Sequence, residues 1–136
     1  MALKLKELKI PIFNYTVLFI SGDIDEAVKY LEDVEDVVLE YDHSCMACTW
    51  SYRDKSAIWF EEDTITLPVM THELIHVTYA MAERLGLEYG DQEVFCYTVE
   101  FLLEEVLKYI NEKIANPCAG KKISVFKILI LTIKYI

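Results

Sequence analysis

The sequence His72-Glu73-Leu74-Ile75-His76 has the residue types and the spacing of half of a zinc hydrolase site. In a helix, residues four apart lie on the same face, so the imidazoles of His72 and His76 can bind one metal ion. Glu73 then lies beside the metal, where its carboxylate can take a proton from a zinc-bound water and pass it to a leaving amine. The motif therefore predicts zinc-dependent hydrolysis of peptide bonds. The competing interpretation is a helix whose two histidines are ordinary polar residues.

The residues around this motif predict that it lies well inside a helix. Pro68 is favourable in a first helical turn, where its missing N–H costs nothing, and Gly86 follows the last apolar position. We expect a helix over residues 68–85. Its apolar residues recur at near-helical spacing and predict a buried side, formed by Leu74, Ile75, Val77, Met81 and Leu85.

A catalytic zinc ion needs a third protein ligand and an open position for water. Residues 86–90 predict a short connector, and residues 92–114 predict a second helix antiparallel to the first. The second helix has one polar face that could turn toward the histidines, formed by Glu93, Tyr97, Glu100 and Glu104. In a strictly antiparallel pair, at about 1.5 Å per residue, the position level with His76 is near Glu100. Glu93 would require a slanted crossing of the two helices.

The segment HELIHVTYAMAERLGLEYGDQEVFCY resembles the core of minimal gluzincin-type zinc metallopeptidases, many of them short proteins encoded by phages. It is more distantly similar to the zinc-peptidase domains that cleave phage-type repressors. The similarity covers about residues 10–110, and its specific motifs are confined to residues 72–97.

The resemblance implies that His72, His76 and Glu93 are the zinc ligands and that Glu73 is the general base. The start of the second helix carries this implication, because Glu93-Val94-Phe95-Cys96-Tyr97 matches the E-x-[FY]-x-[FY] pattern of the family's ligand helix. Glu100 remains the alternative ligand. The chain lacks the second Asp or His that larger gluzincins have downstream, so the group that stabilises the oxyanion is open among Tyr79, Tyr89 and Tyr97.

The first half of the chain predicts the strands that would hold a peptide beside the metal. We expect a first strand and its approach at residues 10–15, and a helix at residues 24–34. Further strands are expected at residues 15–21, 37–41, 48–53 and 57–62, the last two as a hairpin. Ile58, Trp59 and Phe60 are the predicted peptide-binding edge. The predicted fold class is α+β, a small zincin-like domain in which a short mixed or antiparallel sheet packs on the HExxH helix and the ligand-bearing helix.

Composition predicts one domain over residues 1–116, followed by a basic, apolar tail over residues 117–136. The chain has a net charge of −10, which argues against nucleic acid as a partner because phosphate binding needs a concentrated basic surface. Residues 121–136 carry four of the 13 basic residues and no acidic residue. This segment is too short and too charged to span a membrane, and we expect it to dock on the domain or to mediate self-association. The N-terminus lacks a secretory signal, which predicts a cytoplasmic protein, in a host cell or a virion if phage-encoded.

Cys45 and Cys48 form an isolated CxxC pair with His43 nearby. No second pair follows, so reduced thiols are the simpler interpretation and a structural metal or redox role is the alternative.

Two other functions remain open beside the peptidase. A zinc ion with four protein ligands could hold the two helices together in a non-catalytic binding or virion-structural protein. The chain could also be a phage regulator that acts on one host protein.

Overall fold

The computed structural model describes residues 2–87 and 92–115, and the side chains up to residue 108. Within them lie a four-stranded mixed sheet and three helices, so the protein is a small α+β domain, as expected. The predicted tail and Tyr89 lie outside the described residues.

The sheet has the strand order β1-β2-β4-β3. Strands β1 (Lys4–Ile10) and β2 (Tyr15–Ser21) pair antiparallel, and β2 pairs parallel with β4 (Lys55–Phe60). Strand β3 (Ala47–Tyr52) pairs antiparallel with β4 and forms one edge. The predicted hairpin is therefore confirmed, within two residues at each end.

Three predictions about the strands are wrong. Residues 37–41 form no strand, and residues 11–14 form the turn between β1 and β2, so the first strand lies earlier than expected. Strand β4, with Ile58, Trp59 and Phe60, is central and not an edge, because β2 takes its free side in parallel pairing. The near-continuous apolar sequence of β4 is typical of a strand covered on both faces, and all three side chains are buried.

Capping interactions define the helices. Asp23 accepts a hydrogen bond from the Glu26 N–H at 3.0 Å and begins α1 (Ile24–Glu35). Thr66 accepts from the Val69 N–H at 3.4 Å and begins α2 (Leu67–Arg84), and Gly86 follows it at φ 67°. The predicted bounds of α2 are confirmed within one residue, and α3 (Gln92–Ala115) also matches its prediction.

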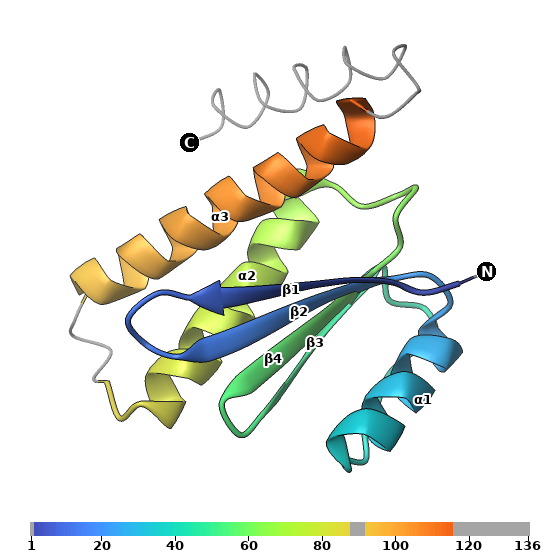
Figure 1. Cartoon of the computed structure of the whole chain (residues 1–136), viewed down its shortest axis with the longest axis horizontal. Helices are drawn as coiled ribbons and strands as arrows, with labels where there is room; N and C mark the ends of the chain where they lie inside the picture. The colour runs from blue at the N-terminus through green and yellow to red at the C-terminus, as the bar shows by residue number, and fades with distance from the viewer. Residues whose placement is uncertain (1, 88–91, 116–136) are drawn as a thin grey trace.

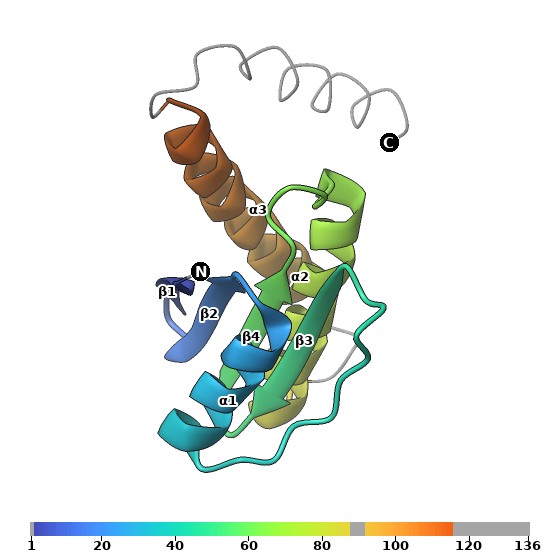
Figure 2. The ribbon, with the colours of Figure 1, turned by 90° about the vertical axis from the view of Figure 1, so that its right-hand side faces the viewer.

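The helices cover opposite faces of the sheet (Figures 1 and 2). Helix α1 packs on one face over a cluster that includes Ile20, Leu31 and Trp59. Helices α2 and α3 pack on the other face, where α2 lies over β3 and β4 and α3 contacts β1. Leu74, in the HExxH motif itself, is fully buried in this second cluster. The core therefore fixes how α2 is rotated about its axis.

Truncation of Leu74 tests this packing. Leu74→Ala should lower the free energy of unfolding by about 3–5 kcal/mol, because the side chain is fully buried and leaves a cavity. Leu85→Ala, at a side chain that is 41% exposed, should cost less than about 1 kcal/mol. Denaturant unfolding at matched pH measures both, and equal losses would contradict the assigned rotation of α2.

Candidate metal centre

Helix α2 brings His72 and His76 together on its exposed face. Their Nε2 atoms lie 3.0 Å apart and their rings meet edge to face, with centroids separated by 4.7 Å. Leu74 and Val77 are buried on the opposite side of the helix, so the core turns both imidazoles toward solvent. The pair is thus accessible to an ion without movement of the backbone.

The separation of these two nitrogens suits a shared metal ion. Two nitrogens bound tetrahedrally to zinc at about 2.0–2.1 Å lie about 3.3 Å apart, close to the observed spacing. Without an ion, one imidazole must donate to the other. The donor type also fits, because imidazole nitrogen is a preferred zinc ligand. The two histidines therefore fit zinc as two of its ligands.

Glu73 points away from the solvent face and toward the sheet. It is 7% exposed, and it accepts a short hydrogen bond from the Thr49 hydroxyl on β3. The edge strand therefore holds the carboxylate of the motif in a fixed place. Sequence reasoning missed Thr49, because nothing in the sequence indicates which strand lies beside α2.

The candidate third ligands lie on the exposed side of α3. Glu93, Tyr97 and Glu100 are all exposed, as expected for residues that share one face. Within residues 2–87 and 92–108, no three His, Cys, Asp or Glu side chains lie together in a group that could hold a metal ion. The assignments of Glu93 and Glu100 stay predictions.

One contact between the helices does bring the start of α3 to α2. The rings of Tyr79 and Phe95 lie with centroids 4.9 Å apart, and Phe95 is two residues from Glu93. Tyr79 and Tyr97 are 44% and 70% exposed, so both phenols are accessible for hydrogen bonding to a ligand.

The CxxC pair lies on the other side of the sheet edge, at the start of β3. Burial first, and then the nearby Cys45 and Glu73, raise the pKa of Cys48 to about 11. A thiol with this pKa is protonated at neutral pH, which makes Cys48 a poor nucleophile.

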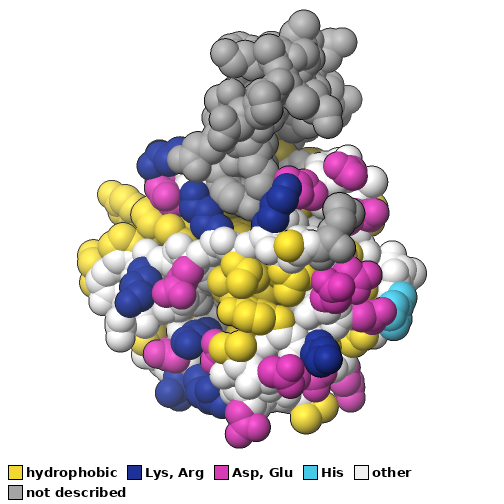
Figure 3. Space-filling view, turned by 45° about the vertical axis from the view of Figure 1, so that its right-hand side comes forward, with side chains coloured by type: hydrophobic (Ala, Val, Ile, Leu, Met, Phe, Trp, Pro, Cys, Tyr) yellow, Lys and Arg dark blue, Asp and Glu magenta, His cyan; other side chains and the backbone are white. Residues whose placement is uncertain are grey.

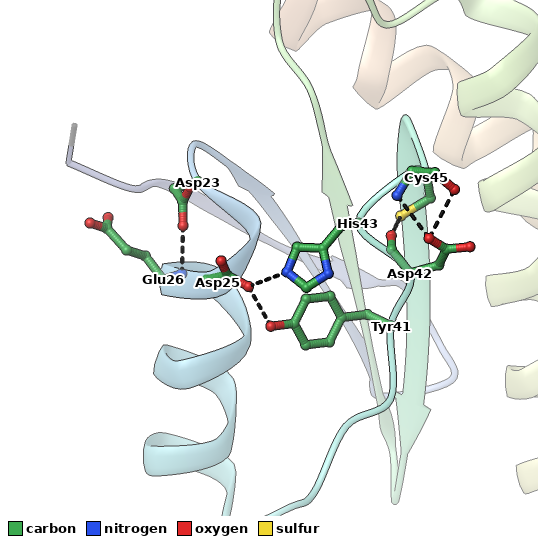
Figure 4. A network of polar contacts seen from close by, with 8 residues as sticks. Asp23, Asp25, Glu26, Tyr41, Asp42, His43 and Cys45 are labelled. Atoms are coloured by element: carbon green, nitrogen blue, oxygen red, sulfur yellow. Dashed lines mark hydrogen bonds and ion pairs between the residues drawn. The ribbon is translucent and has the colours of Figure 1, made fainter.

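His43 belongs to a separate polar cluster that the sequence did not reveal (Figure 4). The Asp25 carboxylate accepts hydrogen bonds from the Tyr41 hydroxyl and, at 2.8 Å, from His43 Nε2. These bonds, from Tyr41 first and then His43, lower the pKa of Asp25. Asp25 lies more than fifteen positions before Tyr41 and His43 in the sequence, so no local pattern could pair it with them. The cluster fastens the loop before β3 to the first turn of α1.

Charge on the visible surface is mixed. The face in Figure 3 carries Lys and Arg side chains interspersed with Asp and Glu around a hydrophobic patch. In the described part of the chain, no helix is long and apolar enough to cross a membrane.

The hydrogen bond between Thr49 and Glu73 can be tested by removing the hydroxyl alone. Thr49→Val keeps the shape of the side chain but leaves a buried carboxylate without this donor, so it should destabilise the fold by about 1–3 kcal/mol. Thr49→Ser retains a donor and should recover most of that loss. Thermal unfolding at neutral pH measures both, and a stable Val variant would show that the bond contributes little.

Comparison of the chain with protein-family models, with curated proteins and with solved structures found no match in any of the three.

Proposed function

We propose that the protein is a zinc-dependent peptidase that hydrolyses peptide bonds with Glu73 as general base. The observation that carries the proposal is the pair of Nε2 atoms 3.0 Å apart on α2, with a fixed, buried carboxylate in the residue after the first histidine. His72 and His76 would hold the ion. Glu93 is the proposed third ligand, with Glu100 as its alternative.

Each group would have a distinct role in the reaction. When bound, zinc would lower the pKa of a coordinated water to near neutrality and so supply the nucleophile. Glu73 would accept the proton on a carboxylate oxygen and deliver it to the leaving amine. The Thr49 hydroxyl supports this role, because it orients the carboxylate while leaving its other oxygen for the proton.

The free edge of the sheet favours a peptide as substrate. The Glu61 N–H donates to the Met46 carbonyl at 3.0 Å, which fixes the alternation of hydrogen bonding between β3 and β4. By that alternation, the backbone groups of Ala47, Thr49 and Ser51 point away from β4. The loop at residues 37–46 runs beside β3 without forming a strand (Figure 2), and its Glu40 carbonyl accepts a hydrogen bond from the Trp50 indole of β3 at 2.9 Å.

An extended peptide could therefore add to β3 as a further strand. Thr49 bonds to Glu73 with its side chain and presents its backbone at this edge. A peptide paired there would pass close to the proposed base. This edge replaces Ile58, Trp59 and Phe60, which lie in the central strand.

Metal content is the first test of the site. Protein purified without a metal tag should contain about one zinc per chain by elemental analysis, and His76→Ala should lose it. Glu93→Ala should lose zinc and Glu100→Ala should keep it. Loss of zinc in Glu100→Ala alone would assign the third ligand to Glu100. Absence of zinc from the reconstituted wild type would overturn the proposal.

Glu73→Gln separates catalysis from metal binding. The variant should keep zinc but lose activity on fluorescein-labelled casein by at least about 10²-fold, because the amide cannot accept the proton. Zinc content and peptide release are measured on the same samples. Full activity in the variant would remove Glu73 from the mechanism.

Removal of the ion distinguishes a catalytic zinc from a structural one. Dialysis against a chelator should abolish casein cleavage while shifting the melting temperature only slightly. If the protein cleaves no casein even before dialysis, and removal of zinc lowers the melting temperature strongly, the ion is instead structural and its binding is part of folding.

A further inference from the structure

A groove runs between α2 and the outer side of α3. It has a volume of about 440 Å³ and is lined by Ile75, Phe95, Cys96, Val99, Glu100, Leu103, Glu104 and Leu107. Its walls are almost entirely apolar side chains, while Glu100 and Glu104 are exposed carboxylates. Burial of these apolar side chains by another segment would be favourable.

Helix α3 has two apolar sides, and the sheet uses only one. On one side of α3, Leu102 and Val106 are buried in the core that α2 and α3 form with the sheet. Val99, Leu103 and Leu107 repeat at spacings of four on the adjacent side and are only partly buried. The second apolar side therefore has room for another segment of polypeptide.

The chain itself supplies a segment of matching chemistry beyond the described residues. Residues 121–136 read KKISVFKILILTIKYI, an apolar sequence with four lysines and no acidic residue. The remaining 120 residues hold all 23 acidic residues, so the charge of this segment is opposite to that of the domain and of the groove's carboxylates.

Length and position also fit. Twelve residues separate Phe95 and Leu107, which gives the groove a length of about 18 Å along α3. The segment begins only six residues after Ala115, where α3 ends, and Pro117 and Gly120 lie between them. The path from Ala115 back to Phe95 is about 30 Å along α3. Sixteen residues in an extended conformation span about 53 Å, and a helix of that length spans about 24 Å and reaches Phe95 only with part of the path covered by residues 116–120.

We propose that residues 121–136 of the same chain occupy the groove between α2 and α3, with their lysines near Glu100 and Glu104. The short connection to α3 favours this segment over that of a second copy, because a tethered segment has a local concentration of about a millimolar. This inference does not depend on the proposed peptidase activity.

Cys96 provides a natural probe, because its thiol lines the groove and is exposed in the described part of the chain. The full-length reduced protein is treated with a limiting maleimide over time, and modification of the Cys96 peptide is measured by mass spectrometry. Docking predicts slow modification in the wild type. Lys127→Glu with Lys134→Glu should accelerate it by at least about tenfold, which corresponds to about 1.4 kcal/mol of docking free energy.

The matched control is Lys9→Glu with Lys29→Glu, which changes the net charge equally at two exposed lysines on β1 and α1. It should leave the rate at Cys96 unchanged. Ile130→Asp tests the apolar contact separately and should also accelerate modification. Circular dichroism confirms that each variant keeps the folded domain.

The proposal is overturned if Cys96 in the wild type reacts as fast as in both tail variants. It is also overturned if the wild-type rate rises when the protein is diluted a hundredfold, because the occupant would then come from a second copy. A rate that is slow at every dilution and fast in both tail variants supports it.

Discussion

The rotation of α2 about its own axis is the constraint on which the site depends. Leu74, Val77 and Met81 are buried against the sheet. Their packing fixes the rotation of α2 and therefore the directions in which its other side chains point. His72 and His76 must then face solvent, while Glu73 must face the edge strand. A helix rotated by one residue would bury an imidazole and expose Leu74, at a cost of several kcal/mol. The hydrophobic core thus sets the directions of the three polar side chains.

The burial of Glu73 is the costly part of this arrangement. A carboxylate taken out of water must be hydrogen-bonded or lose its charge, and the Thr49 hydroxyl supplies one such bond. The donor comes from a strand rather than from the same helix, so the edge of the sheet and the helix are joined through a polar contact. Among the described side chains, Glu73 is the only buried acidic residue. Its contact with Thr49 places it beside β3, the edge strand that packs against α2. The buried carboxylate therefore lies next to an edge of the sheet.

Local signals in the sequence predicted much of the fold. Pro68 and Gly86 act within a few residues, and they predict the bounds of α2. The order of the strands did not follow, because pairing of β2 with β4 joins residues about 40 positions apart and passes over α1 and β3. The sequence therefore predicts an edge strand in β4, whereas β4 is central and the edge strands are β1 and β3. The same limit hid the Thr49–Glu73 bond and the cluster of Asp25, Tyr41 and His43.

The same limit applies to the candidate metal site, of which local patterns predict one part and not the other. His72 and His76 are linked by helical spacing alone, and the structure brings their nitrogens together. A third ligand must come from α3, and its position depends on how two helices cross, which is set by side-chain packing and not by either sequence pattern. The contact between Tyr79 and Phe95 is one such packing contact, and in an antiparallel pair it would set Glu100 near the level of His76 and Glu93 beyond Tyr79. Glu100 lies beside the apolar groove, where an opposite charge on a docked segment would compete for its carboxylate. Docking of residues 121–136 in that groove and zinc binding by Glu100 would therefore exclude each other, because both need the same carboxylate.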